Sequence, residues 1–210
     1  MGGGRLQSRD GSDQPSARSF PTPLLEFFTF SGLAARYPHS RLFGRLDRTW
    51  SDPGQACQVD WVPGAFSIIR REVIDQVGAF DPRFFLYYEE VDLSRRIKQA
   101  NWEIWYWQDI IVTHFGGESS KTITHLTMAS GGAQLTLWRI RSQLLYYRLW
   151  HGAAITFWVK CQEMIWHYLR AWRNRHRNAA KREESETTVR LWKQAWDDTV
   201  GGTVSPPQPW

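Results

Sequence analysis

The stretch "FFLYYEEVDLSRRI", residues 84–97, places an aromatic run directly before three acidic side chains, Glu89, Glu90 and Asp92. It predicts a helix from about Glu89 to Gln99 that ends at Asn101, because asparagine tolerates a left-handed cap. Acidic side chains in a first helical turn face the positive end of the helix dipole, which is one explanation for them. A catalytic base together with a sugar-binding acid is a second explanation.

The segments on either side of this helix indicate an α/β fold. Upstream, "VDWVPGAFSIIRREVIDQVGAFD" (59–81) predicts a strand, a Pro-Gly turn, a second strand over 65–69 and a short helix over 71–76 closed by Gly78. Downstream, "WEIWYW" and "IIVTHF" predict one or two buried strands broken near Gln108 and Asp109. Polar residues fall where these elements end, and ligands gather at such ends in α/β folds.

Composition divides the chain into four regions. Residues 1–23 are rich in Gly, Ser, Arg and Pro and predict an extended or poorly ordered lead-in. Residues 24–132 hold the α/β elements, beginning with a short helix over 24–37 that stops before Pro38. Residues 133–182 predict basic amphipathic helices rich in Trp, and the polar tail 183–210 is expected to be disordered.

The basic region carries two apolar stripes at helical spacing, separated by Gly152. The stripes are Leu137, Ile140, Leu144 and Tyr147, and then Ile155, Trp158, Ile165, Leu169 and Trp172. Residues 133–182 contain ten Arg and Lys residues and one acid, Glu163, whereas the whole chain has a formal charge of +5. A packed helical hairpin fits this pattern, and so does a helix pair on an anionic membrane surface with tryptophans at the headgroups. RNA binding has the charge but no recognised module, so no nucleic acid partner is expected.

Cysteine usage and hydropathy bear on the compartment. Cys57 and Cys161 form no pair pattern, which indicates neither a disulfide scaffold nor a cysteine metal site and fits a reducing cytoplasm. No signal peptide is visible at the start. The longest uncharged apolar stretch, from Leu149 to Val159, has 11 residues, whereas a spanning helix needs roughly 20. We therefore predict a cytoplasmic protein that does not cross a bilayer.

The ordered set of motifs resembles the second half of the catalytic domain in family 2 glycosyltransferases of the GT-A fold, particularly the rhamnosyltransferase-like members of bacterial polysaccharide assembly. The resemblance rests on Gly64-Ala65, "GAFD" at 78–81, "YYEEVDLSRR" at 87–96, Asn101-Trp102, and His114 through Ser119. It implies a partial GT-A-like mixed sheet with flanking helices, followed by amphipathic helices. It extends more weakly from about residue 4 to residue 180.

The resemblance also implies roles for individual residues. Glu90 would remove the proton from the acceptor hydroxyl, with Glu89 and Asp92 in orienting or structural roles and Asp92 able to hold Arg96. His114 would be a ligand of a divalent metal, Mg²⁺ or Mn²⁺, although one imidazole alone cannot build such a site. Substrate contacts are expected at Trp61, Gly64, Ala65, Arg96, Gly117 and Ser119. The competing explanation is core packing for Trp61 and a plain flexible turn for Gly117 and Ser119.

Family members begin with a nucleotide-binding half that includes an Asp-x-Asp motif, and residues 1–58 contain none. The expectation is therefore an inverting glycosyltransferase whose donor half is absent, or a non-catalytic membrane-surface or partner-binding remnant of one. In the first case the partners are a nucleotide-sugar donor, a lipid-linked or saccharide acceptor, and the anionic inner face of the membrane.

Overall fold

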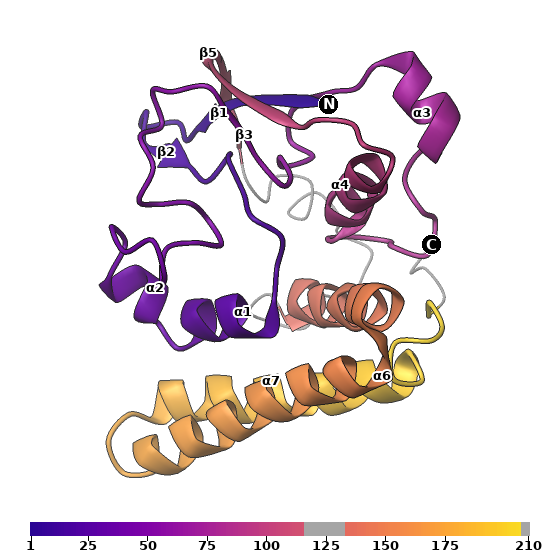
Figure 1. Ribbon diagram of the computed structural model, residues 1–210. Helices are drawn as coiled ribbons and strands as arrows, with labels where there is room; N and C mark the ends of the chain where they lie inside the picture. Colours follow the sequence, from indigo (N-terminus) through magenta and orange to yellow (C-terminus); the bar gives the residue numbers. More distant parts are fainter. Residues whose placement is uncertain (116–132, 207–210) are drawn as a thin grey trace. The chain divides into compact units, whose positions relative to one another are not determined.

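The computed structural model describes residues 1–115 and 133–206, and Figure 1 shows the elements they form. These residues divide into two compact units. The first contains residues 1–81 and 90–115, and the second contains 82–89 and 133–206. Each unit has its own buried residues. No helix within the described ranges is long and apolar enough to cross a membrane.

The first unit is built on a five-stranded mixed sheet in the order β2-β1-β5-β3, with β4 also paired to β1. Strand β1 (Gly2–Gln7) runs parallel to β5 (Trp105–Thr113) and antiparallel to β2 (Asp13–Gln14) and β4 (Ser67–Ile68). On the far side of β5 lies β3 (Cys57–Gln58), which is antiparallel to it. The predicted α/β class with a mixed sheet is confirmed.

Strand β1 corrects the expectation of a lead-in over residues 1–23. Gly2, Gly3 and Gly4 are buried in the sheet. A Cβ on Gly3 would lie 2.6 Å from the Cβ of Val62, and one on Gly4 would lie 2.4 Å from the carbonyl oxygen of Ile110. The glycine run therefore marks close packing of a strand against its neighbours, whereas its composition alone indicates a flexible segment.

Strand β5 is one continuous element with an irregular middle. Gly4 pairs with Trp107 and the next residue, Arg5, pairs with Ile111, so three residues of β5 stand outside the register with β1. This bulge coincides with the break predicted near Gln108 and Asp109. The aromatic and β-branched run on either side of it forms a single strand.

Four helices belong to the chain up to residue 99: α1 (Pro23–Phe30), α2 (Leu33–Arg36), α3 (Arg71–Val77) and α4 (Glu89–Gln99). The single helix predicted over 24–37 is divided by Gly32, whose φ of 82° ends the helical path. Helix α4 has the predicted bounds, and Asn101 beyond it adopts a φ of 63°. The main core joins this helix to the sheet and α3 through Val59, Val62, Val73, Leu93, Ile97, Ile104 and Tyr106.

The second unit is dominated by α6 (Ala133–Asn174) and α7 (Ala179–Asp198), which lie side by side in Figure 1. Gly152 adopts a φ of 78° and kinks α6, as its place between the two stripes predicted. Leu137, Ile140, Leu144 and Tyr147 of the first stripe are buried.

Helix α7 corrects the expectation of a disordered tail over 183–210, as far as residue 206 is concerned. Its N-cap residue Asn178 accepts a hydrogen bond from the backbone N–H of Lys181 at 2.9 Å. Val189, Trp192 and Ala195 are buried at spacings of three residues, which is the signature of one helix face. The tail is polar overall, but this sparse apolar stripe suffices to pack α7 against α6.

Candidate active site

The turn at residues 61–65 meets the first turn of α4. A Cβ on Gly64 would lie 4.0 Å from the Cβ of Glu90, so two residues that are 26 positions apart, in two of the motifs, come together. Gly64 and Ala65 are exposed, whereas Glu89 and Glu90 are half-buried. The turn is therefore open to solvent, whereas Glu90 beside it is partly covered.

The backbone that leads into these acids is strained. Tyr87 and Tyr88 have φ values of 67° and 66°, and a bulky side chain with positive φ is a genuine outlier. The segment is fixed within the second unit, where Ser142 Oγ donates to the carbonyl oxygen of Leu86 at 2.7 Å. The ring of Tyr88 also packs on Tyr146, with 5.2 Å between ring centroids. Such strain persists where the surroundings impose it, and it concentrates at functional sites.

Burial separates Glu89 from an ordinary surface acid. Desolvation raises the pKa of the Glu89 carboxyl above its usual value of 4.5, because removal from water disfavours the charged form. The Glu89 carboxyl therefore keeps its proton to a higher pH than an exposed glutamate does. This is the setting that proton-transfer chemistry uses.

Asp92 and Arg96 form a structural pair. The Nε–H of Arg96 donates to Asp92 Oδ2 at 2.9 Å, and the Asp92 side chain is 1% exposed. The remaining guanidinium nitrogens donate to the carbonyl oxygens of Val77 (2.6 Å) and Ala79 (2.8 Å). The predicted hold of Asp92 on Arg96 is confirmed, and it ties α4 to the end of α3. Arg96 is thus engaged within the protein, which argues against the substrate contact predicted for it.

Trp61 is a packing residue in this structure. It is 8% exposed, its indole N–H donates to the carbonyl oxygen of Ser19 at 2.9 Å, and the guanidinium of Arg18 lies 4.6 Å from its ring centroid. A face covered by a guanidinium does not stack on a sugar. The explanation of Trp61 as core packing is therefore the one the geometry favours.

His114 follows β5 and is held by Gln14. The Gln14 side-chain amide donates to the carbonyl oxygen of His114 at 3.1 Å, so its oxygen faces His114 Nδ1 at 2.8 Å. Nδ1 must then carry the proton, and in a neutral ring Nε2 is left with the lone pair that binds metals. Within residues 1–115 and 133–206, however, no group of three His, Cys, Asp or Glu side chains gathers that could hold an ion. These residues do not build a Mg²⁺ or Mn²⁺ site on their own, and the metal role of His114 stays a prediction. Gly117 and Ser119 lie outside the described residues.

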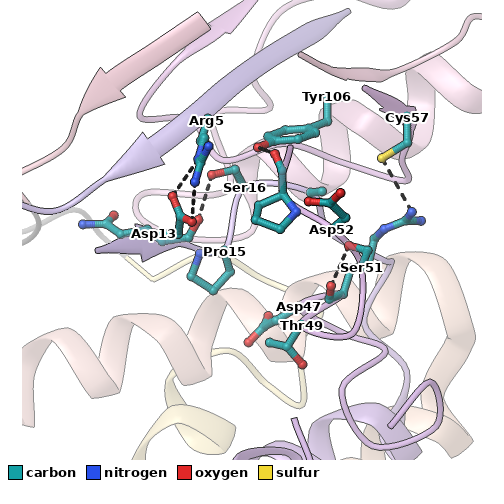
Figure 2. A pocket seen from close by; sticks show the side chains of 14 residues that line it. Arg5, Asp13, Pro15, Ser16, Asp47, Thr49, Ser51, Asp52, Cys57 and Tyr106 are labelled. Carbon is teal, nitrogen blue, oxygen red and sulfur yellow. Dashed lines mark hydrogen bonds and ion pairs between the residues drawn. The ribbon is translucent and has the colours of Figure 1, made fainter. Parts of the chain in front are cut away.

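A cavity of about 220 Å³ lies beside β1, at a place that the motifs did not single out (Figure 2). Arg5 and Asp13 form a two-pronged ion pair at its edge, with both contacts at 2.7 Å, and this pair lowers the pKa of the Asp13 carboxyl. The Tyr106 hydroxyl donates to the carbonyl oxygen of Pro53 at 2.7 Å, and burial raises its pKa. Glu90 does not line this cavity, so the pocket expected around Glu90 stays a prediction.

Comparison with known proteins identifies one kind of relative. No family model matches the chain, and no solved structure matches it significantly. The N-acetylglucosaminyl-diphospho-decaprenol L-rhamnosyltransferases of Mycobacterium tuberculosis strains CDC 1551 / Oshkosh and ATCC 25618 / H37Rv are each 31% identical to it over 115 residues. The match covers 55% of this chain and 37% of each relative, so the chain spans little more than a third of their length. The protein is therefore a distant homologue of a mycobacterial rhamnosyltransferase of glycosyltransferase family 2, as its motif order indicated.

Proposed function

We propose that this chain contributes the acceptor side of an inverting glycosyltransferase, which moves a sugar from a nucleotide-sugar donor to a saccharide acceptor. Two observations carry the proposal: the strained Tyr87-Tyr88 backbone that leads into the two acids, and the approach of Glu90 to the exposed Gly64 turn. A helix-dipole role alone would not need strained backbone before the helix. Similarity to the mycobacterial enzymes supports the same class of reaction.

In the proposed reaction Glu90 acts as the general base. Its carboxylate takes the proton of the acceptor hydroxyl while the hydroxyl oxygen forms a bond to the anomeric carbon of the donor sugar. The bond from that carbon to the nucleoside diphosphate breaks, and the diphosphate departs with the electron pair. Attack from the opposite side inverts the anomeric configuration. Glu89, with its raised pKa, lies beside the base and is positioned to orient the acceptor.

The acceptor in this proposal is linked to a lipid and is met at the membrane surface. Both mycobacterial relatives act, by name, on a sugar diphosphate carried by decaprenol. On α6 the second stripe is exposed, with Trp158 57%, Ile165 57%, Leu169 57% and Trp172 66% accessible. Arg173, Arg175 and Arg177 are exposed just beyond it. Apolar side chains flanked by arginines suit the boundary between headgroups and acyl chains of an anionic inner membrane face.

Glycosyl transfer tests the catalytic part. The protein is incubated with UDP- and dTDP-sugars and with N-acetylglucosaminyl-diphospho-prenol as the acceptor. We expect Glu90→Gln to lower the rate by about 10²- to 10⁴-fold, because the amide keeps the shape but cannot take the proton. Asp75→Asn, which changes an exposed acid of α3, is the control and is expected to retain the rate.

Because the chain matches 37% of the relative, the same variants are also assayed in a chimera whose other segments come from the mycobacterial enzyme. Equal rates for the unchanged sequence and Glu90→Gln would refute the role of Glu90. A product with retained anomeric configuration would refute the inverting mechanism.

A further inference from the structure

The loop between α2 and β3 carries two arginines on one tryptophan. The guanidinium carbon of Arg41 lies 4.9 Å from the ring centroid of Trp50, and that of Arg48 lies 5.3 Å from it. With His39 and Ser51, these side chains line a cavity of about 330 Å³. Nothing in the motif order of the chain drew attention to this loop.

Arg48 is held in place by its backbone. Its φ is 49°, a conformation that costs energy in any residue with a side chain. Thr49 Oγ1 donates to the carbonyl oxygen of Pro38 at 2.6 Å, and Ser51 Oγ donates to that of Arg48 at 2.7 Å. The loop is therefore fixed before any ligand arrives, and strained backbone of this kind concentrates at ligand clamps.

Two buried donors at this cavity lack an acceptor within the described parts of the chain. Arg48 donates to the thiol of Cys57 at 3.6 Å, and sulfur is a weak acceptor. The Nε–H of Arg48 and the indole N–H of Trp50 are buried and have no hydrogen-bond partner within the described parts of the chain. Asp52, the carboxylate on this cavity, accepts from the backbone N–H of Gly54 at 2.8 Å. An incoming anion would bring the oxygen acceptors that these donors lack.

The geometry selects a phosphate-type anion with more than one phosphorus. Guanidinium groups bind phosphate oxygens through paired N–H donors, and two of them flank this cavity. A diphosphate offers oxygens to both at once. The cavity adjoins the one beside β1, because Arg48, Ser51, Asp52 and Cys57 line both. Figure 2 shows three of these residues, Ser51, Asp52 and Cys57, together with Tyr106. A group attached to the diphosphate would extend toward Tyr106.

We propose that Arg41 and Arg48 form a binding site for a diphosphate group, with Trp50 as the platform that aligns them. The diphosphate is carried either by a prenol, as in a lipid-linked acceptor, or by a nucleoside, as in the product of a sugar donor. This assignment of the source rests on the proposed function, whereas the site itself rests on the loop geometry.

Calorimetry with inorganic pyrophosphate tests the site without turnover. Arg41→Gln and Arg48→Gln are each expected to weaken binding about tenfold or more, because each removes charge-assisted hydrogen bonds. Arg45→Gln removes a positive charge from the same loop, at an exposed residue that lines neither cavity, and is expected to leave the affinity within about twofold. Arg41 is also exposed, so its variant keeps the test valid if Arg48→Gln perturbs folding.

Farnesyl diphosphate and UDP distinguish the sources. Tighter binding of farnesyl diphosphate, lost in Arg41→Gln, supports an acceptor group, and tighter binding of UDP, lost in the same variant, supports a donor product. The site is refuted if pyrophosphate does not bind, or if Arg41→Gln and Arg48→Gln weaken it no more than Arg45→Gln does. A protein that binds pyrophosphate through the pair but transfers no sugar, alone or in the chimera, refutes the proposed function and leaves the site standing.

Discussion

The acids of the motif differ in their surroundings, because the carboxylate of Asp92 is buried against Arg96. Through Arg96 it reaches the carbonyl oxygens that follow α3, so it holds the loop at Val77–Ala79 against α4. Glu90, two residues earlier, lies instead beside the exposed Gly64 turn. Asp92 thus stabilises the fold, whereas the proton transfer proposed above rests on Glu90.

Removal of Asp92 should therefore cost stability. We expect Asp92→Ala to lower the free energy of unfolding by about 3–5 kcal/mol, because it leaves a guanidinium in a largely buried site without its carboxylate. Asp75→Ala is the matched control, since Asp75 and Arg71 form the same i, i+4 pair with 57% and 85% of their side chains exposed. That change should cost about 0–1 kcal/mol. Urea denaturation followed by circular dichroism measures both, and similar losses in the two variants would contradict a structural role for Asp92.

Sequence reasoning assigned Gly64 and Glu90 to one substrate site, because both belong to motifs whose order is informative, but it did not predict their contact. It also anticipated that Asp92 could hold Arg96, from helical spacing alone. It could not find the left-handed backbone at Tyr87, Tyr88 and Arg48, because tyrosine and arginine carry no signal for positive φ. The Arg41–Trp50–Arg48 cluster was missed for a similar reason, since a polar connector between elements looks like any solvated loop.

At the scale of elements, composition misled where packing decides. The three glycines that begin β1 predict a flexible segment from composition alone. The close approach of Val62 and Ile110 explains why the strand has glycine at these positions. In the hairpin of α6 and α7, by contrast, apolar residues at helical spacing turn out to be exposed. The apolar stripe from Trp158 to Trp172 is exposed, whereas the opposite face of α6, with Thr156, Val159, Glu163 and His167, is buried. Periodicity located the apolar stripe, but it did not identify the opposite face as the buried one.

Glu163 is the polar centre of that buried face. Its carboxylate accepts from the Gln143 amide at 3.2 Å and from the Trp192 indole N–H at 3.0 Å. Burial raises its pKa above the ordinary 4.5. Above pH 4.5 Glu163 therefore holds its proton more firmly in the folded chain than in the unfolded chain, and this contribution to stability is lost as the pH rises through the higher, folded-state pKa.

Glu163→Gln should remove this pH dependence, because glutamine resembles the protonated acid and keeps an oxygen for Trp192. At pH 8 we expect a Tm about 2–4 °C above that of the unchanged protein, equivalent to about 1 kcal/mol in a chain of this size. Near pH 4 the two should converge. Burial lowers the pKa of His167 to about 4, so His167 adds stability as the pH rises from about 4 toward 6.5, equally in both proteins. Calorimetric scans from pH 4 to 9 measure the difference, and a constant difference would contradict the assignment to Glu163.

For the molecule as a whole, charge and apolar exposure coincide at the end of α6. Trp172 is 66% exposed, and the guanidinium of Arg175 lies 5.8 Å from its ring centroid. Arg170, one turn earlier, instead pairs with Glu184 of α7 at 2.8 Å and belongs to the hairpin. The membrane surface proposed above therefore consists of Trp158, Ile165, Leu169 and Trp172 with Arg173, Arg175 and Arg177.

Vesicle sedimentation tests this membrane surface. We expect the protein to bind vesicles that contain phosphatidylserine and to bind neutral phosphatidylcholine vesicles weakly. Changing Arg173, Arg175 and Arg177 to Gln should weaken binding by about 100-fold, because each basic residue near an anionic surface contributes about 1 kcal/mol. Changing Arg9, Arg45 and Arg71 to Gln, which are exposed in the first unit, removes the same charge and should have a much smaller effect.

The apolar contribution is tested by Trp158→Ser combined with Trp172→Ser. This variant should weaken the binding that persists at high salt, since burial of the rings does not depend on screening. Equal binding of the protein to both vesicle types would rule out the electrostatic contribution. Equal losses of binding in the two triple arginine variants would refute the assignment of the membrane surface to α6.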